Sequence, residues 1–173
     1  TKAQRRDTQA KISKFVDINI NALSFQMLTI RSDDTTAHDT YYESYNNPTL
    51  SKWADWCEEQ GTYIDIGAHT GIYSLACLFA NTENNLVSIE PLPINYYRIL
   101  TNMRLNGLDL FKRCSLFNVA VSDQIKKVKF STASLEVSQS YLSKGSKIVS
   151  EGMDMQAISI DSLRFGDAKT QVK

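Results

Sequence analysis

Two carboxylates and two glycines have the types and the spacing to bind a nucleotide-like ligand. Asp65 stands two residues before Gly67, Gly71 follows, and Glu90 closes the next apolar run along the chain. A carboxylate at the end of a strand can accept hydrogen bonds from both hydroxyls of a ribose. A glycine lets a ligand come close to the backbone, and the N–H groups at a helix start point outward. The four residues therefore predict a site for a ribose-containing ligand.

The elements around Gly67 must be a strand, a turn and a helix. Residues 63–66 mix β-branched and aromatic side chains, which is typical of a buried strand. The helix is predicted to run from Ile72 to Ala80, because apolar residues recur there at helical spacing. Those residues are Ile72, Leu75, Ala76 and Phe79.

The same alternation of strand and helix continues downstream. Residues 86–89 form a second apolar run, a helix capped by Asn95 is predicted to end at Gly107, and a third strand is predicted over 115–121. The order β-α-β-α-β is typical of a parallel, doubly wound sheet. We therefore predict an α/β, Rossmann-like fold with helices on both faces. The residues that this fold would gather at one rim of the sheet are Gly67, Glu90 and Ala120.

The residues before this pattern predict a hairpin and helices. Residues 15–20 and 25–30 alternate apolar and polar side chains, with Asn21 and Ala22 between them. Residues 31–36 are predicted to be a loop. Residues 38–45 would place three tyrosines on one helix face, packed against the hairpin or lining a substrate pocket. Ser51 is predicted to cap a helix over 51–58, with Trp53 and Trp56 facing inward.

The part of the chain after Asp123 is predicted to leave the parallel pattern. Residues 126–131 and 157–160 are predicted strands, and 161–165 predict a helical turn. The polar segment 132–154 between the strands is predicted to be a long loop or a flap over the site.

The composition is that of one globular structural domain. A chain of 173 residues with 42% apolar and 22% charged residues can bury a core. We divide it into an N-terminal extension, 1–60, and an incomplete cofactor-binding part, 61–173. Nineteen basic and nineteen acidic residues cancel, which argues against a nucleic-acid partner. No apolar run approaches the roughly 18 residues of a membrane span.

Three cysteines, Cys57, Cys77 and Cys114, lack the close pairing of a zinc or redox motif. We expect free thiols that are buried or half-buried, which favours a reducing compartment and a cytoplasmic location. No cluster of histidines or acids predicts a metal site.

The turn lacks the features that bind phosphates. A dinucleotide fingerprint needs glycines where this chain has His69 and Ile72, and no P-loop lysine follows. S-adenosylmethionine has no phosphate but carries an ammonium, a carboxylate, a ribose diol and a sulfonium. Glu90 can accept the ribose hydroxyls, and Asp65 can order the turn or receive the ammonium through water. The predicted cofactor is therefore S-adenosylmethionine.

Three segments, YIDIGAHTGIYSLA, VSIEPLPINYYRILTNMRLNGL and FNVAVSD, resemble the FkbM-type methyltransferases. That family depends on S-adenosylmethionine and has a Rossmann-like class I fold. The resemblance covers residues 63–123 and extends loosely to AISIDSL. It implies O-methylation of a hydroxyl on a sugar, glycan or natural product. The residues that it assigns to the cofactor are Asp65, Gly67, Ala68, His69, Gly71, Glu90, Pro91, Asn118, Val119 and Ala120.

Within that set the resemblance implies separate roles. Glu90 would hold the ribose, and Asn118, Val119 and Ala120 would border the adenine. His69 stands where the family commonly has asparagine. The structural alternatives are a surface acid at a strand end for Glu90, a turn residue without a ligand for His69, and a strand cap for Asn118.

The catalytic base is not identified. The family continues after TxDSL with a strand resembling KIDVEG, and this sequence stops where that strand would begin. The candidate bases are Asp39, Glu43 and His69, whereas His38 is interpreted as a helix-start residue. We expect an open sheet edge through which the chain forms a homodimer or binds another chain. The alternative functions are a non-catalytic module for protein association, an inactive fragment of a larger enzyme, and a nicotinamide-dependent dehydrogenase.

Overall fold

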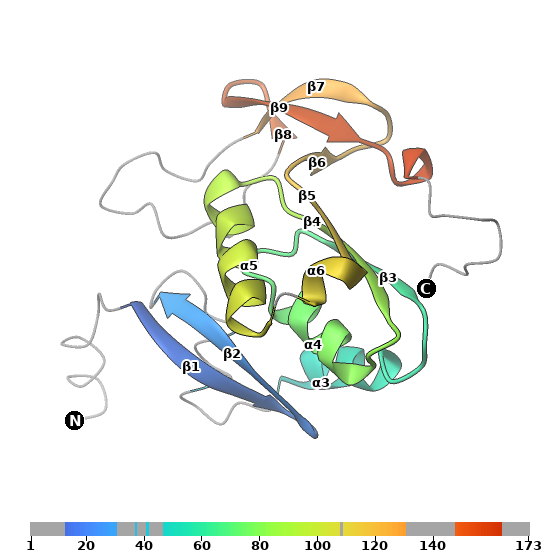
Figure 1. Cartoon of the computed structure of the whole chain (residues 1–173). Helices are drawn as coiled ribbons and strands as arrows, with labels where there is room; N and C mark the ends of the chain where they lie inside the picture. The colour runs from blue at the N-terminus through green and yellow to red at the C-terminus, as the bar shows by residue number, and fades with distance from the viewer. Residues whose placement is uncertain are drawn as a thin grey trace.

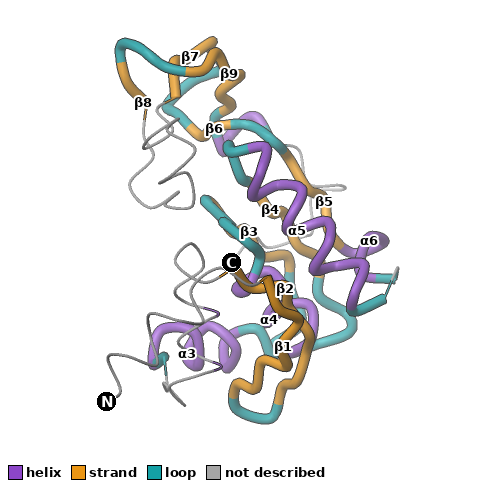
Figure 2. The backbone as a smooth tube through the Cα atoms, turned by 90° about the vertical axis from the view of Figure 1, so that its left-hand side faces the viewer, coloured by secondary structure: helices purple, strands orange, loops and turns teal. Residues whose placement is uncertain are grey.

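The computed structural model of the chain describes residues 13–30, 37, 41, 47–107, 109–130 and 148–163. Its strands form a two-stranded hairpin, a three-stranded sheet and a four-stranded sheet (Figure 1). The four-stranded sheet lies at one end of the molecule, and the hairpin lies at the other (Figure 2). The three-stranded sheet and its helices occupy the middle.

The predicted N-terminal hairpin is confirmed. Strands β1 (Ser13–Ile20) and β2 (Leu23–Ile30) pair antiparallel, with Ile20 opposite Leu23. Asn21, in the turn, has a φ of 52°, in the left-handed region that asparagine tolerates better than most residues. Its side-chain amide donates to the Ser51 carbonyl at 3.1 Å and to Asp55 Oδ1 at 2.7 Å. The turn of the hairpin is thereby fixed to the following helix.

Helix α3 (Pro48–Trp56) begins three residues before the predicted start. Asn47 caps it by accepting hydrogen bonds from the N–H groups of Thr49 and Leu50, so Ser51 is not the cap. Pro48 suits the first helical position, because its ring presets φ and no N–H is needed there. Trp53 is half-buried, as predicted, but Trp56 is 61% exposed, because it lies beyond the buried stripe of the helix.

The middle of the molecule is the predicted α/β unit. Strands β3 (Thr62–Ile66), β4 (Asn85–Ile89) and β5 (Cys114–Phe117) pair in parallel in the order β3-β4-β5. Helix α4 (Ile72–Ala80) connects the first two strands, and α5 (Pro93–Leu105) with the short α6 (Leu110–Arg113) connects the last two. The parallel β-α-β-α-β order is therefore confirmed.

Two boundaries in this unit differ from the prediction. Helix α5 starts at Pro93, so Asn95 lies inside the helix rather than capping it. The predicted strand 115–121 is two strands in different sheets, because β5 ends at Phe117 and β6 (Ala120–Val121) begins after a break. Asn118 lies between these two strands, and its side chain bonds to the backbone that follows β4.

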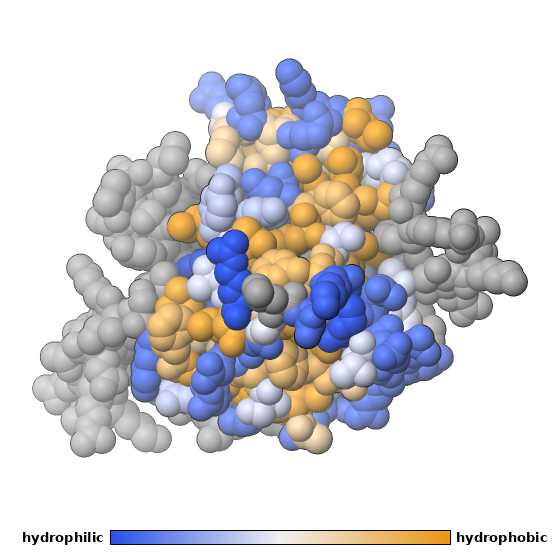
Figure 3. Space-filling model, viewed as in Figure 1, coloured by the Kyte–Doolittle hydropathy of each residue, from blue (hydrophilic) through white to orange (hydrophobic). Residues whose placement is uncertain are grey.

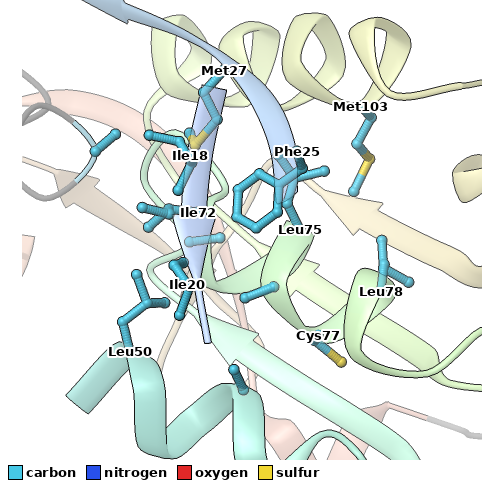
Figure 4. Close-up of a cluster of buried hydrophobic side chains, with 14 of the residues drawn as sticks. Ile18, Ile20, Phe25, Met27, Leu50, Ile72, Leu75, Cys77, Leu78 and Met103 are labelled. Atoms are coloured by element: carbon cyan, nitrogen blue, oxygen red, sulfur yellow. The ribbon is translucent and has the colours of Figure 1, made fainter. Parts of the chain in front are cut away.

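The large apolar core lies between the hairpin and one face of the parallel sheet (Figure 4). It joins buried side chains of α3, α4, α5 and α6 to Tyr63 and Leu86 of the sheet. On the opposite face, Ile66 and Phe117 are 54% and 38% exposed. On that same face, Val87 and Ile89 of the central strand β4 are buried. Figure 3 shows one side of the surface, where apolar residues form an irregular band between hydrophilic groups.

The four-stranded sheet has the order β6-β9-β7-β8. Strands β7 (Lys126–Phe130) and β9 (Met153–Ile158) confirm two predicted strands, although β9 begins four residues earlier than expected. Strand β8 (Ile148–Val149) and the start of β9 occupy part of the predicted loop 132–154. The helical turn after β9 is the 3₁₀ helix η1 (Ile160–Ser162). A small separate cluster, with Ala120, Phe130 and Ala157, is the core of this sheet.

Several predictions fall outside the described residues. They are the loop 31–36, most of the tyrosine-rich helix with His38, Asp39 and Glu43, and residues 132–147 of the predicted loop 132–154. Ala37 and Tyr41 are helical. Within the described ranges, no helix is long and apolar enough to cross a membrane, and no group of three or more His, Cys, Asp or Glu side chains could hold a metal ion.

The cysteines are free, as predicted, with Cys57 and Cys77 buried and Cys114 half-buried. Although far apart in sequence, Cys57 and Cys77 meet at Asn84, whose side-chain amide donates to both of their carbonyls, at 2.7 Å and 3.0 Å. Asn84 also accepts from the N–H of Gly61 at 3.0 Å. One buried amide thus ties α3 and α4 to the start of β3.

Candidate functional site

The carboxyl ends of the three parallel strands carry the predicted site. The turn 67–71 follows β3, Glu90 follows β4, and Asn118 follows β5. The register pairs Ile66 with Ile89 and Ile89 with Phe117, so the three strand ends are level. The structure therefore brings these predicted site residues to one rim.

The turn 67–71 has an unusual backbone. Gly67, His69 and Gly71 have φ values of 76°, 53° and 91°, all in the left-handed region. Packing also favours a glycine at Gly71, because a Cβ there would lie 3.3 Å from two side-chain carbons of Ile99, which would have to shift. The left-handed conformation of His69 was not predicted. Asparagine, aspartate and histidine are the non-glycine residues enriched there, so its residue type was the available signal.

The N–H groups of this turn are engaged inside the protein. Gly67 and Ala68 donate to the Ile89 carbonyl at 2.8 Å and 3.1 Å, and Gly71 donates to the Ala68 carbonyl at 2.8 Å. The N–H of His69 donates to Glu90 Oε2 at 2.8 Å. A phosphate-binding turn must aim such groups at its ligand. These four amides of the turn are therefore not available to cradle a pyrophosphate.

Glu90 is only 4% exposed and links the strand ends. Besides the His69 N–H, its carboxylate accepts from the Leu92 N–H at 2.9 Å and from Asn95 Nδ2 at 3.4 Å. Burial raises the pKa of this carboxyl, although the three hydrogen bonds oppose the shift. A carboxylate has about four lone-pair positions, so these contacts leave it capacity for a ligand hydroxyl. The role of Glu90 in joining the two loops was not predicted.

Asp65 lies beside two buried serines of the same unit. Ser74 Oγ, on α4, donates to Asp65 Oδ2 at 2.6 Å, and lies 2.9 Å from Ser88 Oγ on β4. Burial raises the pKa of Asp65 to about 6, against the effect of the Ser74 hydrogen bond. Neither serine was predicted as part of the site. Their hydroxyls fix the carboxylate at the start of the turn.

Asn118 acts on the backbone of the neighbouring loop. Its side-chain amide donates to the carbonyls of Glu90 and Pro91, both at 2.8 Å. The Glu90 N–H in turn donates to the Phe117 carbonyl at 3.0 Å. Asn118 is exposed and Val119 is half-buried, whereas Ala120 is buried in the cluster of the other sheet. The structure thus places Asn118 against Glu90, and Ala120 in a different sheet.

The charge of the site is negative. Asp65 contributes to raising the pKa of Glu90, which is the effect of a second carboxylate nearby. The first turn of α4, by contrast, has no acidic residue and no side-chain cap, because its N-cap is Gly71. The partial positive charge of a helix start therefore lies close to two carboxylates. This arrangement suits a ligand with a cationic group, hydroxyls and a carboxylate.

No protein-family model matches this chain, and neither does any curated protein. Solved structures with a similar arrangement include the methyltransferase FkbM from Methylobacillus flagellatus KT, with 13% identity and a TM-score of 0.42 over 61% of this chain and 23% of that chain. A SAM-dependent methyltransferase from Agrobacterium tumefaciens has 10% identity and a TM-score of 0.47, over 65% and 34%. TYW2 of Pyrococcus horikoshii, in complex with MeSAdo, has 16% identity and a TM-score of 0.42, over 63% and 37%. This chain thus spans about a quarter to a third of the length of these proteins.

Proposed function

We propose that this chain binds S-adenosylmethionine at the rim formed by the turn 67–71 and Glu90. The observation that carries the proposal is the engagement of the turn amides inside the protein, combined with two carboxylates at the strand ends. A site in which four of the five turn amides are engaged inside the protein, and in which acidic groups are present for hydroxyls and a cation, favours this ligand over a dinucleotide.

The residues have distinct parts in the proposed complex. Glu90 accepts a ribose hydroxyl through the lone pair that its three internal contacts leave. Asp65 faces the ammonium group, directly or through water, and the uncapped start of α4 favours the carboxylate. When bound, S-adenosylmethionine supplies a methyl group on a sulfonium, which is an electrophile for a nucleophilic acceptor. Asn118 and Val119 border the adenine.

The proposed reaction of the whole protein is O-methylation, in an FkbM-type methyltransferase acting on a hydroxyl of a sugar, glycan or natural product. The family resemblance of residues 63–123 supports this substrate class. Of the candidate bases, His69 is the one within the described residues. Free cysteines support a reducing, cytoplasmic location. Within the described part of the chain, β3 is an edge strand of its sheet, which supports association with another strand.

The test is calorimetric titration of the chain with S-adenosylhomocysteine. Glu90→Gln keeps one acceptor oxygen for the internal N–H donors but removes the charge, so we expect affinity to fall by about tenfold or more. The matched control is Glu83→Gln, an exposed acid in the loop before β4, which should bind as the unmodified chain does.

Two results would overturn the proposal. One is unchanged affinity in Glu90→Gln with the thermal unfolding of the variant intact. The other is binding of NADH in preference to S-adenosylhomocysteine.

A further inference from the structure

Among the described residues, strand β2 has one edge without a strand neighbour, because the hairpin is a sheet of two strands. Gln26 and Leu28 lie two residues apart on it, and both direct backbone N–H groups away from β1, toward α5. An open edge of this kind normally needs another strand or water to satisfy its hydrogen-bonding groups.

Two asparagines close this edge, Asn102 in α5 and Asn106 at the C-cap of that helix. Asn106 Oδ1 accepts from the Gln26 N–H at 2.8 Å, and its Nδ2 donates to the Gln26 carbonyl at 2.7 Å. One turn earlier, Asn102 Oδ1 accepts from the Leu28 N–H at 2.7 Å. Four residues of an α-helix rise about 6 Å, and two residues of a strand rise about 6.7 Å. Asparagines at this spacing therefore match alternate residues of a strand and replace a third strand.

Asn102 makes a second contact that Asn106 does not make. Its Nδ2 donates to the Thr70 carbonyl at 2.8 Å, inside the turn 67–71. Asn102 is fully buried and Thr70 is 1% exposed, so water does not compete for either group. The oxygen of one amide thus holds the hairpin, while its nitrogen holds the turn.

We propose that Asn102 is a positioning residue that couples docking of the N-terminal hairpin to the conformation of the cofactor turn. An aspartate at this position would lack the donor, and a leucine would lack both groups, so the amide is specific to the double contact. Displacing β2 frees Asn102 to rotate and removes the support of the Thr70 carbonyl. Because coupling between two sites is reciprocal, a ligand that orders the turn also strengthens docking of the hairpin. This last step depends on the proposed function.

The first arm of the test uses no ligand. Amide hydrogen exchange is measured by NMR in the unmodified chain, in Asn106→Ala, which breaks only hairpin contacts and the bond to the Asn102 carbonyl, and in Asn102→Leu. We expect Asn106→Ala to speed exchange of the Gln26 amide and also of the Gly71 amide, each by about fivefold or more. The Ser122 amide, bonded to the Ile158 carbonyl in the other sheet, is the reference for effects outside the hairpin and the parallel unit.

The matched control for these variants is Thr101→Ala. Thr101 lies on the same helix, but its hydroxyl bonds only to the Tyr97 carbonyl among the described contacts, so turn and hairpin should exchange normally. Faster exchange at Gln26 with no change at Gly71 would overturn the coupling, as would equal acceleration at Ser122. If Asn102→Leu fails to fold, Asn106→Ala still decides.

The second arm adds S-adenosylhomocysteine. In the unmodified chain, we expect the ligand to slow amide exchange both in the turn 67–71 and at Leu28. In Asn102→Leu, we expect the ligand to slow exchange in the turn but not at Leu28. Protection of Leu28 that persists in Asn102→Leu would overturn the proposal. Absence of binding would count against the proposed function, and the ligand-free arm would then decide the coupling by itself.

Discussion

The polar contacts within the parallel unit differ in kind from those within the four-stranded sheet. In the first, buried amides and hydroxyls bond to backbone that is distant in sequence, as Asn84 and Asn102 do. In the second, exposed ion pairs join Lys126 to Asp123 and Lys129 to Asp154, around a small apolar cluster. A buried hydrogen-bonded group is costly to remove, whereas an exposed ion pair contributes little. The difference teaches that the site belongs to the part of the molecule that tolerates least change.

The largest effect should come from Asn84→Ala, which leaves the carbonyls of Cys57 and Cys77 and the N–H of Gly61 buried without this partner. We expect the free energy of unfolding to fall by about 3 kcal/mol, measured by urea denaturation. The matched control is Gln156→Ala, an exposed amide of β9 that bonds to the carbonyls of Lys126 and Ala157. An equal loss of unfolding free energy in the two variants would contradict the difference between the polar contacts of the two sheets.

A smaller effect on the free energy of unfolding should come from pH, and its sign should differ between Asp65 in the parallel unit and Asp123 beside the four-stranded sheet. Burial raises the pKa of Asp65 to about 6. Its contribution to stability is therefore complete below pH 4 and is lost as the pH rises through 6. Asp65→Asn should remove this loss and stabilise the chain at pH 7 by up to about 2 kcal/mol, with a flatter profile of melting temperature from pH 4 to 7.

The acid to compare with Asp65 is Asp123 in the other part of the molecule. Hydrogen bonds from Lys126 and Ser122 lower the pKa of Asp123 to about 2. Its contribution is present above pH 4 and is lost as the pH falls toward 2, the opposite sign. Asp123→Asn should thus leave the profile between pH 4 and 7 unchanged. A steeper profile in Asp65→Asn than in the unmodified chain would contradict the burial of that carboxylate.

The smallest effect should come from Lys129→Gln, which removes a 2.6 Å ion pair with Asp154. Both side chains are largely exposed, so water and salt screen the attraction. We expect the urea midpoint to match that of the unmodified chain within error, at low and at high salt. A clear loss confined to low salt would show that exposed charges hold the four-stranded sheet together more firmly than its geometry indicates.

The elements that sequence predicted well are those with a strong local pattern. Strand β3 and helix α4 have apolar residues at the period of their own structure, so their bounds were predicted within one residue. The break between β5 and β6 was missed, because residues 115–121 read as one apolar run while the interruption depends on a bond from Asn118 to a distant loop. The start of α3 carried a local signal, Asn47 followed by Pro48, which the prediction of Ser51 as the cap did not use.

The candidate site was predictable in position but not in its contacts. Glycines and carboxylates at strand ends indicate where a ligand binds, since parallel strands bring their carboxyl ends together. Nothing local indicates that the Glu90 carboxylate would accept the His69 N–H, or that Ser74 and Ser88 would fix Asp65. These contacts join residues that only the tertiary fold brings into reach.

All three cysteines of the chain lie in or beside the parallel unit, and none lies in the four-stranded sheet. A hydrogen bond with Cys57 together with burial raises the pKa of the Cys77 thiol, and burial raises that of Cys114 to about 12. The thiolate is the nucleophile that attacks an alkylating reagent, so the thiols of a closed parallel unit react slowly. The rate of cysteine alkylation, followed by mass spectrometry, thus measures how often the parallel unit opens. The measurement needs no introduced cysteine and does not respond to fraying of the four-stranded sheet.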